Sequence, residues 1–328
     1  MLGKMDYAGL THQGLIRETN EDSFLLANLS KSLRVLHSSL SFDDFSELHG
    51  ESQGFLMAVA DGMGGHRAGE RASQLAIDAI IRFLLDELPW NWVSETDTSE
   101  VLVALRGSVL AARDAIAADV GVSPQHAGMG TTLTLALLLW PQAYVIHVGD
   151  TRCYLCRGGV LRQLTHDHTV AQLRDDLRTG AATDRQKERF GSVNWESVGS
   201  SEALWNVISA EVESIEADAM RVGLEIGDSL LLCSDGLSRL VDHATIQRLV
   251  AREGSCDTIC QSLIDAANAA GGGDNVTAVL IRFHPASSKV ARRAAAQSLD
   301  DTLDFDAEGL FDPSGGPGEV EAGILERR

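Results

Sequence analysis

The spacing of apolar residues changes several times along this chain, and each change predicts a different type of element. Residues 54–60 form an almost continuous apolar run that ends at an Asp-Gly pair, which is typical of a buried strand. Apolar positions then recur at helical spacing over residues 68–88 and again over residues 99–120. We therefore expect a core strand followed by two amphipathic helices.

The period becomes shorter in the middle of the chain. Short apolar segments separated by turn-forming pairs predict an antiparallel meander over residues 131–139, 143–148, 153–157 and 160–164. A strand, two helices and a last strand are predicted over residues 229–233, 243–252, 256–270 and 276–283. This order lacks the strict alternation of a doubly wound parallel sheet. The expected class is α+β, with antiparallel sheets covered by helices.

Three polar segments interrupt this pattern. Residues 30–53 are rich in serine and predict a long loop or an irregular hairpin. Residues 167–206 are charged and only weakly periodic, which is typical of a surface excursion. Acidic residues and a Pro-Ser-Gly-Gly-Pro-Gly stretch follow residue 285, so residues 286–328 are predicted to be a disordered acidic tail. The expected organisation is one domain over residues 1–285 and this tail.

The composition narrows the classes of function. The formal net charge of -20 disfavours nucleic acid or an anionic membrane as the main partner. No apolar stretch is suited to a signal peptide or a membrane span, so we expect a cytoplasmic protein. The cysteines are odd in number, which suits free thiols in a reducing compartment. A zinc site at Cys153 and Cys156 is disfavoured, because an odd spacing in a strand points the two side chains to opposite faces.

Acidic residues stand at the ends of several predicted core strands. Asp61, Asp150 and Asp235 each follow an apolar strand, and Asp274 comes just before the last one. A single Asp-Gly pair is typical of a turn, but four acids at such ends are expected to converge at the rim of the core. Gathered carboxylates repel each other unless they are protonated or bind cations. Oxygen ligands without nearby Cys or His favour Mg²⁺ or Mn²⁺, and a pair of such ions commonly serves to cleave phosphate esters.

A second candidate site lies near the N-terminus, in the segment Arg17-Glu18-Thr19-Asn20-Glu21-Asp22. Arginine can bind a phosphate dianion through two parallel hydrogen bonds, and the acids offer oxygens to a metal or to its waters. Taken alone, this segment is more typical of a solvated turn of mixed charge. The glycine-rich run after Asp61 is also weak evidence by itself, since it lacks the pattern of a P-loop.

Seven motifs resemble, in their order, the PPM-type metal-dependent protein phosphatases (protein phosphatase type 2C), particularly the bacterial members. They lie between residues 7 and 283 and read Arg17-x-x-Asn20-Glu21-Asp22, Asp61-Gly62-Met63-Gly64-Gly65, Gly128-Met129-Gly130-Thr131-Thr132, Val148-Gly149-Asp150-Thr151-Arg152, Leu164-Thr165-x-Asp167-His168, Ser234-Asp235-Gly236-Leu237 and Gly273-Asp274-Asn275-Val276-Thr277. Each motif is modest alone, but seven in order are very specific. The resemblance implies a four-layer α-β-β-α sandwich of two antiparallel sheets flanked by helices. It also implies a mobile flap over about residues 167–206.

The resemblance implies a ligand set for two Mn²⁺ or Mg²⁺ ions. Asp61 would bridge both ions, and the carbonyl oxygen of Gly62 would bind the second. Asp235 and Asp274 would hold the first ion. The implied mechanism is direct attack on phosphorus by a hydroxide that bridges the metals, without a phosphoenzyme and without a cysteine nucleophile.

Further roles follow from the same resemblance. Glu21 and Asp22 would bind the second ion directly or through water, and Arg17 would clamp the phosphate. Asp150, together with Asp235, would hold a weaker third ion of the kind found in bacterial members.

The expected function is that of a protein serine/threonine phosphatase. Its expected partners are phosphorylated proteins, namely the substrates of a bacterial Ser/Thr kinase and the kinase itself, and a monomer is expected. Two alternatives remain open: a phosphatase-like regulatory domain that binds phosphoproteins with little activity, and a hydrolase of a small phosphorylated metabolite. Silent domains usually lose their metal aspartates, and here all of them are present. Met63 stands where many eukaryotic members have a histidine proposed as general acid, so no general acid is assigned.

Overall fold

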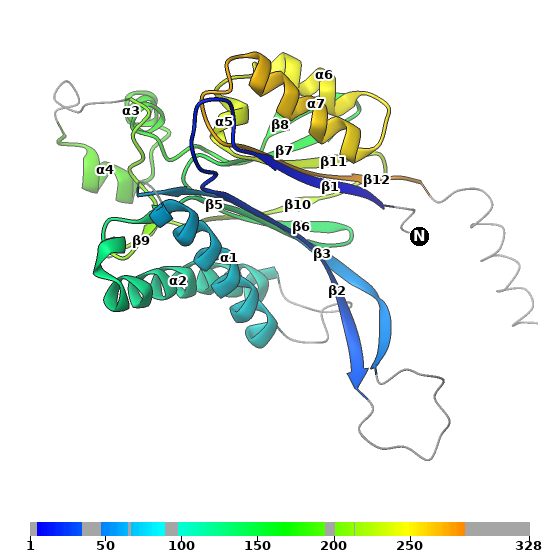
Figure 1. The fold of residues 1–328 in the computed structure, drawn as a ribbon, viewed down its shortest axis with the longest axis horizontal. Coiled ribbons are helices and arrows are strands. Elements are labelled where there is room, and N and C mark those ends of the chain that lie inside the picture. Colours follow the sequence, from blue (N-terminus) through cyan, green and yellow to red (C-terminus); the bar gives the residue numbers. More distant parts are fainter. Residues whose placement is uncertain are drawn as a thin grey trace, which may run out of the picture. The chain divides into compact units, whose positions relative to one another are not determined.

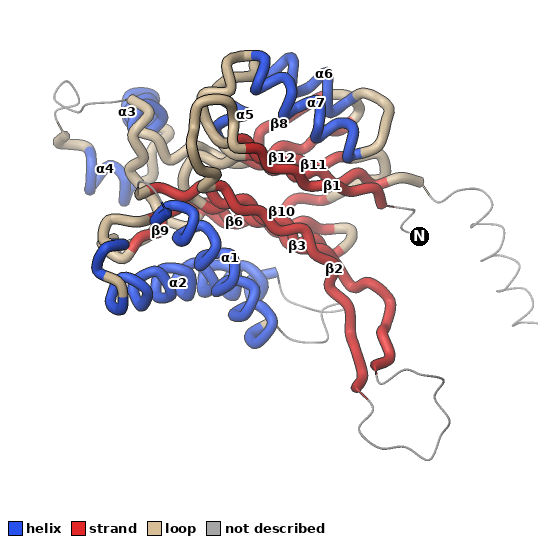
Figure 2. Tube along the Cα trace, viewed as in Figure 1, coloured by secondary structure: helices blue, strands red, loops and turns tan. Residues whose placement is uncertain are grey.

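Two antiparallel sheets are stacked face to face, and helices cover both outer faces (Figures 1 and 2). The structure is a computed structural model that describes residues 5–34, 47–64, 67–88, 98–193, 201–212 and 214–285. The predicted α+β class and the four-layer α-β-β-α arrangement are confirmed. The predicted acidic tail, residues 286–328, lies outside the described residues.

The first sheet carries the C-terminal strands and the N-terminal strand. Its order is β1-β12-β11-β7-β8, with β1 at Met5–His12, β7 at Arg152–Arg157, β8 at Val160–Gln163, β11 at Ser229–Cys233 and β12 at Val276–Phe283. Helices α6 (His243–Ala251) and α7 (Cys256–Ala269) cover its outer face. Each helix begins at a side-chain cap: Asp242 accepts a hydrogen bond from the Thr245 amide, and Ser255 accepts one from the Thr258 amide.

The second sheet is built around a long hairpin. Its order is β10-β6-β5-β3-β4-β9, and β2 also pairs with β3. The strands have the following bounds: β2 (Asp22–Arg34), β3 (Glu47–Met63), β4 (Gly130–Thr131), β5 (Leu133–Leu139), β6 (Gln142–Val148), β9 (Ile208–Ser209) and β10 (Asp218–Gly223). Helices α1 (Arg67–Glu87) and α2 (Thr98–Val122) cover the outer face, and the short helix η1 (Pro124–His126) follows them. The apolar face of each long helix is buried against this sheet, as the helical spacing in the sequence predicts.

The inner faces of the two sheets share one apolar core. It combines side chains of β3, β5 and β6 with side chains of β7, β11 and β12, among them Met57, Val59, Ala136, Leu232, Val279 and Ile281. Burying each of the larger side chains, valine, leucine, isoleucine or methionine, contributes about 1.5–3 kcal/mol. This shared core fixes the ends of strands from both sheets relative to each other.

The two internal polar segments are partly described. The predicted insertion, residues 30–53, begins as a continuation of the β2–β3 hairpin, whose last pair is Arg34 with Glu47, and residues 35–46 lie outside the described residues. The segment at residues 167–206 contains α3 (Val170–Thr179) and α4 (Asp184–Phe190). Neither short helix was predicted, although a threonine caps the start of each one: Thr169 for α3 and Thr183 for α4.

A pair of histidines anchors the first part of this segment to β6. The rings of His147 and His168 lie 4.9 Å apart, and the amide of His168 donates to the carbonyl of Gly149. His147 is fully buried; its Nε2 donates to the carbonyl of His166, and its Nδ1 lies 2.9 Å from the hydroxyl of Thr134. Both ring nitrogens are therefore satisfied in the neutral form. Burial, and then the charge of His168, lower the pKa of His147 to about 3.

We expect this histidine to make the metal-free protein sensitive to acid. Below pH 6.5 the unfolded chain binds a proton at His147, whereas the folded chain does not do so until about pH 3. The free energy of unfolding therefore falls as the pH falls, by about 2 kcal/mol from this group between pH 6.5 and pH 5. Urea unfolding in EDTA should show this loss in the wild type and a smaller one in His147→Gln. Equal slopes for both proteins would contradict the prediction.

Two further expectations can be compared with the fold. All five cysteines are free, as predicted, and the structure shows in addition that all of them are buried. Among the described residues, no helix combines the length and the apolar character needed to cross a bilayer.

Candidate functional site

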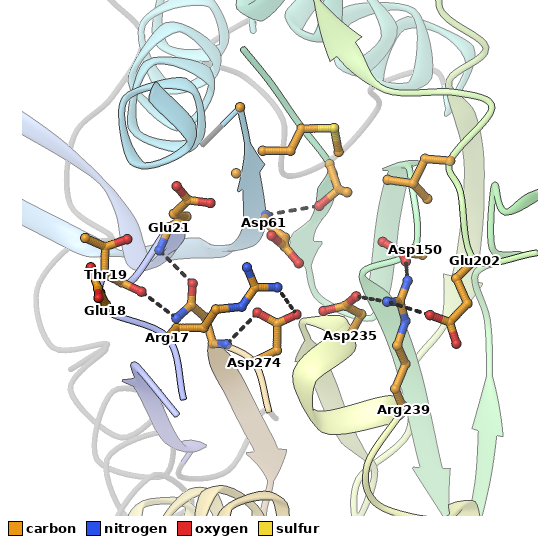
Figure 3. A pocket seen from close by; sticks show the side chains of 16 residues that line it. Arg17, Glu18, Thr19, Glu21, Asp61, Asp150, Glu202, Asp235, Arg239 and Asp274 are labelled. Atoms are coloured by element: carbon orange, nitrogen blue, oxygen red, sulfur yellow. Dashed lines mark hydrogen bonds and ion pairs between the residues drawn. The ribbon is translucent and has the colours of Figure 1, made fainter. Parts of the chain in front are cut away.

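One cavity of about 500 Å³ lies where strand ends of the two sheets meet. Asp61 at the end of β3, Asp150 after β6, Asp235 after β11 and Asp274 before β12 all line it, as the sequence analysis expected for the four strand-end acids. Arg17, Glu21 and Gly62 line the same cavity (Figure 3). Six of the seven predicted ligands and the predicted phosphate clamp thus come together here.

The main chain of Asp61 is held from two sides. Its amide donates to the hydroxyl of Thr132, and its carbonyl accepts from the amide of Thr132 and from the hydroxyl of Thr131. These bonds join the end of β3 to the last residue of β4 and to Thr132, which follows it. They leave the Asp61 carboxylate pointing toward the cavity, where it lies beside Asp235 (Figure 3).

Glycines allow Glu21 and Gly62 to approach the start of α1. The amide of Gly62 donates to the carbonyl of Glu21 at 3.2 Å. A Cβ atom on Gly69 would lie only 2.7–2.9 Å from the carboxylate atoms of Glu21, so the carboxylate packs directly against this glycine. This close packing sets Glu21 beside Gly62, where the sequence analysis expects the second ion.

Asn275 fixes the loop that carries Arg17 and Glu21. Its amide nitrogen donates to the carbonyls of Gln13 and Thr19, and its amide oxygen accepts from the amide of Glu21. Asn275 belongs to the motif at residues 273–277, but no role was predicted for it from the sequence. A buried amide can satisfy three main-chain groups at once, and only the tertiary structure shows which ones.

Arg17 forms an ion pair with Asp274. The distance from Nη2 to Oδ2 is 2.7 Å, and the Arg17 side chain is 52% exposed. A half-exposed guanidinium at the mouth of the cavity can exchange this carboxylate for a phosphate group, because both present two oxygens to the same planar fork.

Asp22 is buried and is not among the described residues that line the cavity. Its Oδ2 accepts from the hydroxyls of Ser234 and Thr277 at 2.7 and 2.6 Å. Burial outweighs these two bonds and raises the pKa of Asp22 to about 7. The carboxyl joins β2 to the strands that carry Asp235 and Asp274, and its predicted contact with the second ion stays a prediction.

Arg239 is a cavity residue that the sequence analysis missed. Its guanidinium contacts Asp150 Oδ2 at 2.7 Å and Asp235 Oδ2 at 2.9 Å (Figure 3). It follows the one-turn helix α5 (Asp235–Ser238), four residues after Asp235. The spacing of Asp235 and Arg239 in the sequence is compatible with this contact, since residues four apart on a helix are neighbours.

The carboxylates of the cavity are held in an unfavourable electrostatic state. Burial, and then the charges of Asp22 and Asp235, raise the pKa of Asp61 well above its ordinary value. Burial also raises the pKa of Asp235, and burial with the charge of Asp235 raises that of Asp150 to about 6. Bound divalent cations would remove this repulsion.

The donor set fits Mn²⁺ or Mg²⁺ at Asp61, Asp235 and Asp274, because all their ligand atoms are hard oxygens. Asp235 Oδ1 is buried and receives no hydrogen bond in the described part of the chain. No three acidic, His or Cys side chains of the described residues are already grouped as a metal would hold them. Arg17 contacts Asp274 instead, and Arg239 contacts both Asp150 and Asp235.

The four-layer sandwich and its carboxylate-lined cavity are those of a metal-dependent phosphatase. A family model described as protein phosphatase 2C matches residues 34–265. The serine/threonine phosphatase stp of Listeria monocytogenes is 33% identical over 227 residues, which are 69% of this chain and 83% of that protein. The serine/threonine protein phosphatase PstP of Mycobacterium tuberculosis is 33% identical over 274 residues, 84% of this chain and 44% of that protein.

Solved structures of related phosphatases share this fold. The crystal structure of M. tuberculosis PstP/Ppp has a TM-score of 0.63 at 32% identity and covers 86% of this chain and 99% of that chain. The catalytic domain of PstP, solved with two manganese ions, has a TM-score of 0.61 at 31% identity over the same shares. The chain belongs to the protein phosphatase 2C family, and the predicted family is confirmed.

Proposed function

We propose that the chain hydrolyses phosphoserine and phosphothreonine in proteins at this cavity, by direct attack of water-derived hydroxide and without a phosphoenzyme. The predicted class, a protein serine/threonine phosphatase, is confirmed by the family and by relatives that carry this name. The family is metal-dependent, and a related structure contains manganese. The proposal rests above all on the meeting of Asp61, Asp235, Asp274 and Arg17 in one cavity.

The proposed centre holds two Mn²⁺ or Mg²⁺ ions. Asp61 would bridge them, Asp235 and Asp274 would complete the first, and Glu21 with the Gly62 carbonyl would face the second. Asp22 would act on the second ion through water. Such ions neutralise the charge of the phosphate and lower the pKa of a bound water.

The protein's own groups bind and orient the substrate. Arg17 would hold two phosphate oxygens after releasing Asp274, and its loop is fixed by Asn275. The hydrogen bonds from Thr131 and Thr132 keep Asp61 in place during turnover. The cavity is open to solvent beside Arg17, which suits a phosphorylated side chain on a protein surface.

We further propose a cytoplasmic, monomeric enzyme that acts on substrates of a bacterial Ser/Thr kinase and on the kinase itself. The relatives support phosphorylated proteins as substrates, since they are named serine/threonine phosphatases. The net charge of -20 favours substrates that carry basic residues around the phosphorylated site.

A substrate panel tests the function. The full chain is given phosphoserine, phosphothreonine and phosphotyrosine peptides and small sugar phosphates, with Mn²⁺ and with EDTA. We expect Mn²⁺-dependent release of phosphate from the first two peptides. Faster turnover of the sugar phosphates would favour the metabolite alternative, and no turnover at any metal concentration would favour the silent binding domain.

Arg17→Ala is expected to raise KM for a phosphothreonine peptide about tenfold or more, because charged hydrogen bonds to phosphate contribute about 1.5–3 kcal/mol. Steady-state kinetics measure it, and Arg82→Ala, on the exposed face of α1, is the control. If Arg17 served only to hold Asp274, the variant would change Mn²⁺ affinity and leave KM unaltered.

A further inference from the structure

Arg239 lies between two carboxylates that are almost completely buried. The side chains of Asp150 and Asp235 are 5% and 9% exposed, and the guanidinium contacts Oδ2 of each at 2.7 and 2.9 Å. Figure 3 shows the guanidinium between the two acids, on the side of the cavity away from Arg17. These two acids are the pair that the sequence analysis expected to hold a third ion.

A divalent ion between Asp150 and Asp235 would lie directly beside the Arg239 guanidinium, and two cations at such a short separation repel each other. Arg239 occupies Asp150 Oδ2 and Asp235 Oδ2, and its charge is permanent at any physiological pH. An ion at this position would have to displace a cation that already contacts one oxygen of each acid. The side chains therefore do not fit a third ion, although they fit the two-ion centre: Asp235 Oδ1, which receives no hydrogen bond from the described residues, stays available to that centre.

The same guanidinium reaches the segment that borders the cavity. Arg239 Nη1 lies 3.6 Å from Oε2 of Glu202, which also lines the cavity. The main chain around Glu202 is tied to the start of α3, because the amides of Ala171 and Val170 donate to the carbonyls of Ser201 and Ala203. The arginine side chain is long enough to contact Asp150, Asp235 and Glu202 at the same time. A metal ion between the two aspartates would need a further ligand to connect them to Glu202.

We propose that Arg239 replaces the third divalent ion in this chain, holding Asp150 and Asp235 in place and linking them to Glu202. This inference rests on the proposed two-ion centre. It makes Arg239 a positioning residue and removes Asp150 from the set of metal ligands. The enzyme then depends on two ions, without a weak third one.

Anomalous diffraction from crystals soaked in Mn²⁺ tests the proposal directly. We expect density near Asp61, Asp235 and Asp274, and none between Asp150 and Asp235 in the wild type. In Arg239→Ala we expect an additional manganese between those two acids, which disappears in Arg239→Ala/Asp150→Asn. Arg71→Ala, which breaks an ion pair between α1 and α2, is the matched control and should leave the wild-type pattern unchanged.

The kinetic counterpart is rescue by metal. Arg239→Ala should lose about tenfold in kcat/KM at low Mn²⁺ and regain most of it at high Mn²⁺, whereas the wild type should reach its plateau without a weak-affinity phase. Manganese between Asp150 and Asp235 in the wild type would overturn the proposal, and this result needs no variant to fold. The absence of an additional ion in a folded Arg239→Ala would also overturn it. Absence of manganese near Asp61 is a separate result, which would remove the two-ion centre itself.

Discussion

Asp61→Asn is expected to lower kcat/KM for a phosphothreonine peptide about a thousandfold or more at saturating Mn²⁺. The substitution removes the carboxylate that is proposed to bridge both ions, and with it the stabilisation of charge during phosphoryl transfer. Steady-state kinetics measure the loss, and titration calorimetry should show that tight Mn²⁺ binding disappears as well.

In the metal-free protein, the same substitution should increase stability. Burial and neighbouring acids raise the pKa of Asp61, so its ionised form is unfavourable in the folded chain at neutral pH. An amide at this position carries no charge and can donate a hydrogen bond to the neighbouring Asp235 carboxylate. We therefore expect Asp61→Asn in EDTA to unfold at a higher temperature than the wild type.

Asp78→Asn on α1 is the matched control, because its carboxylate is exposed and pairs only with Arg82 among the contacts described for it. It should keep wild-type activity and wild-type Mn²⁺ binding. Full activity of Asp61→Asn would contradict the proposed centre, and a lower melting temperature in EDTA would contradict the electrostatic explanation.

The sequence predicts the elements whose apolar residues are buried on a regular period. The last strand, Val276–Phe283, has the predicted bounds, because seven of its eight residues are buried and most of them are apolar. α6 and α7 start where predicted, at residues that follow capping side chains. The four strand-end acids were found for the same reason: a buried strand makes its polar end conspicuous.

The elements that were missed depend on partners far away in the chain. β1 pairs with β12 from Met5–Phe283 to His12–Val276, and none of its residues is fully buried, so no apolar run marks it. β10 likewise has a half-exposed pattern and pairs with β6. Such strands are formed by tertiary pairing and carry a weak local signal.

Cavity residues outside the acid set were missed for a related reason. Asn275 and Arg239 act through contacts with Thr19, Gln13, Asp150 and Asp235, and three of these four lie far from them in sequence. The sequence shows the charge and hydrogen-bonding capacity of a side chain. Which groups it satisfies depends on the packed fold.

Gly62→Ala is expected to lower the free energy of unfolding by about 3 kcal/mol and to abolish activity. A Cβ atom at this position would overlap the carbonyl group of Gly69 and lie 2.8 Å from the carbonyl oxygen of Glu21. All of these are main-chain atoms, so β3 and the start of α1 would have to separate, and such overpacking is costly. The shift would also move the Gly62 carbonyl, the proposed ligand of the second ion, away from Glu21.

Gly121→Ala is the matched control, since Gly121 lies near the end of α2 and a Cβ atom there meets nothing within 4 Å. This control should keep full activity and either wild-type stability or a gain of up to about 1 kcal/mol. Urea unfolding in EDTA separates the loss of stability from the loss of metal binding, because it measures the free energy of unfolding in the absence of metal. If Gly62→Ala kept wild-type stability but lost Mn²⁺ binding, the carbonyl alone would matter; if it kept both, the close approach of β3 and α1 would have no role in the site.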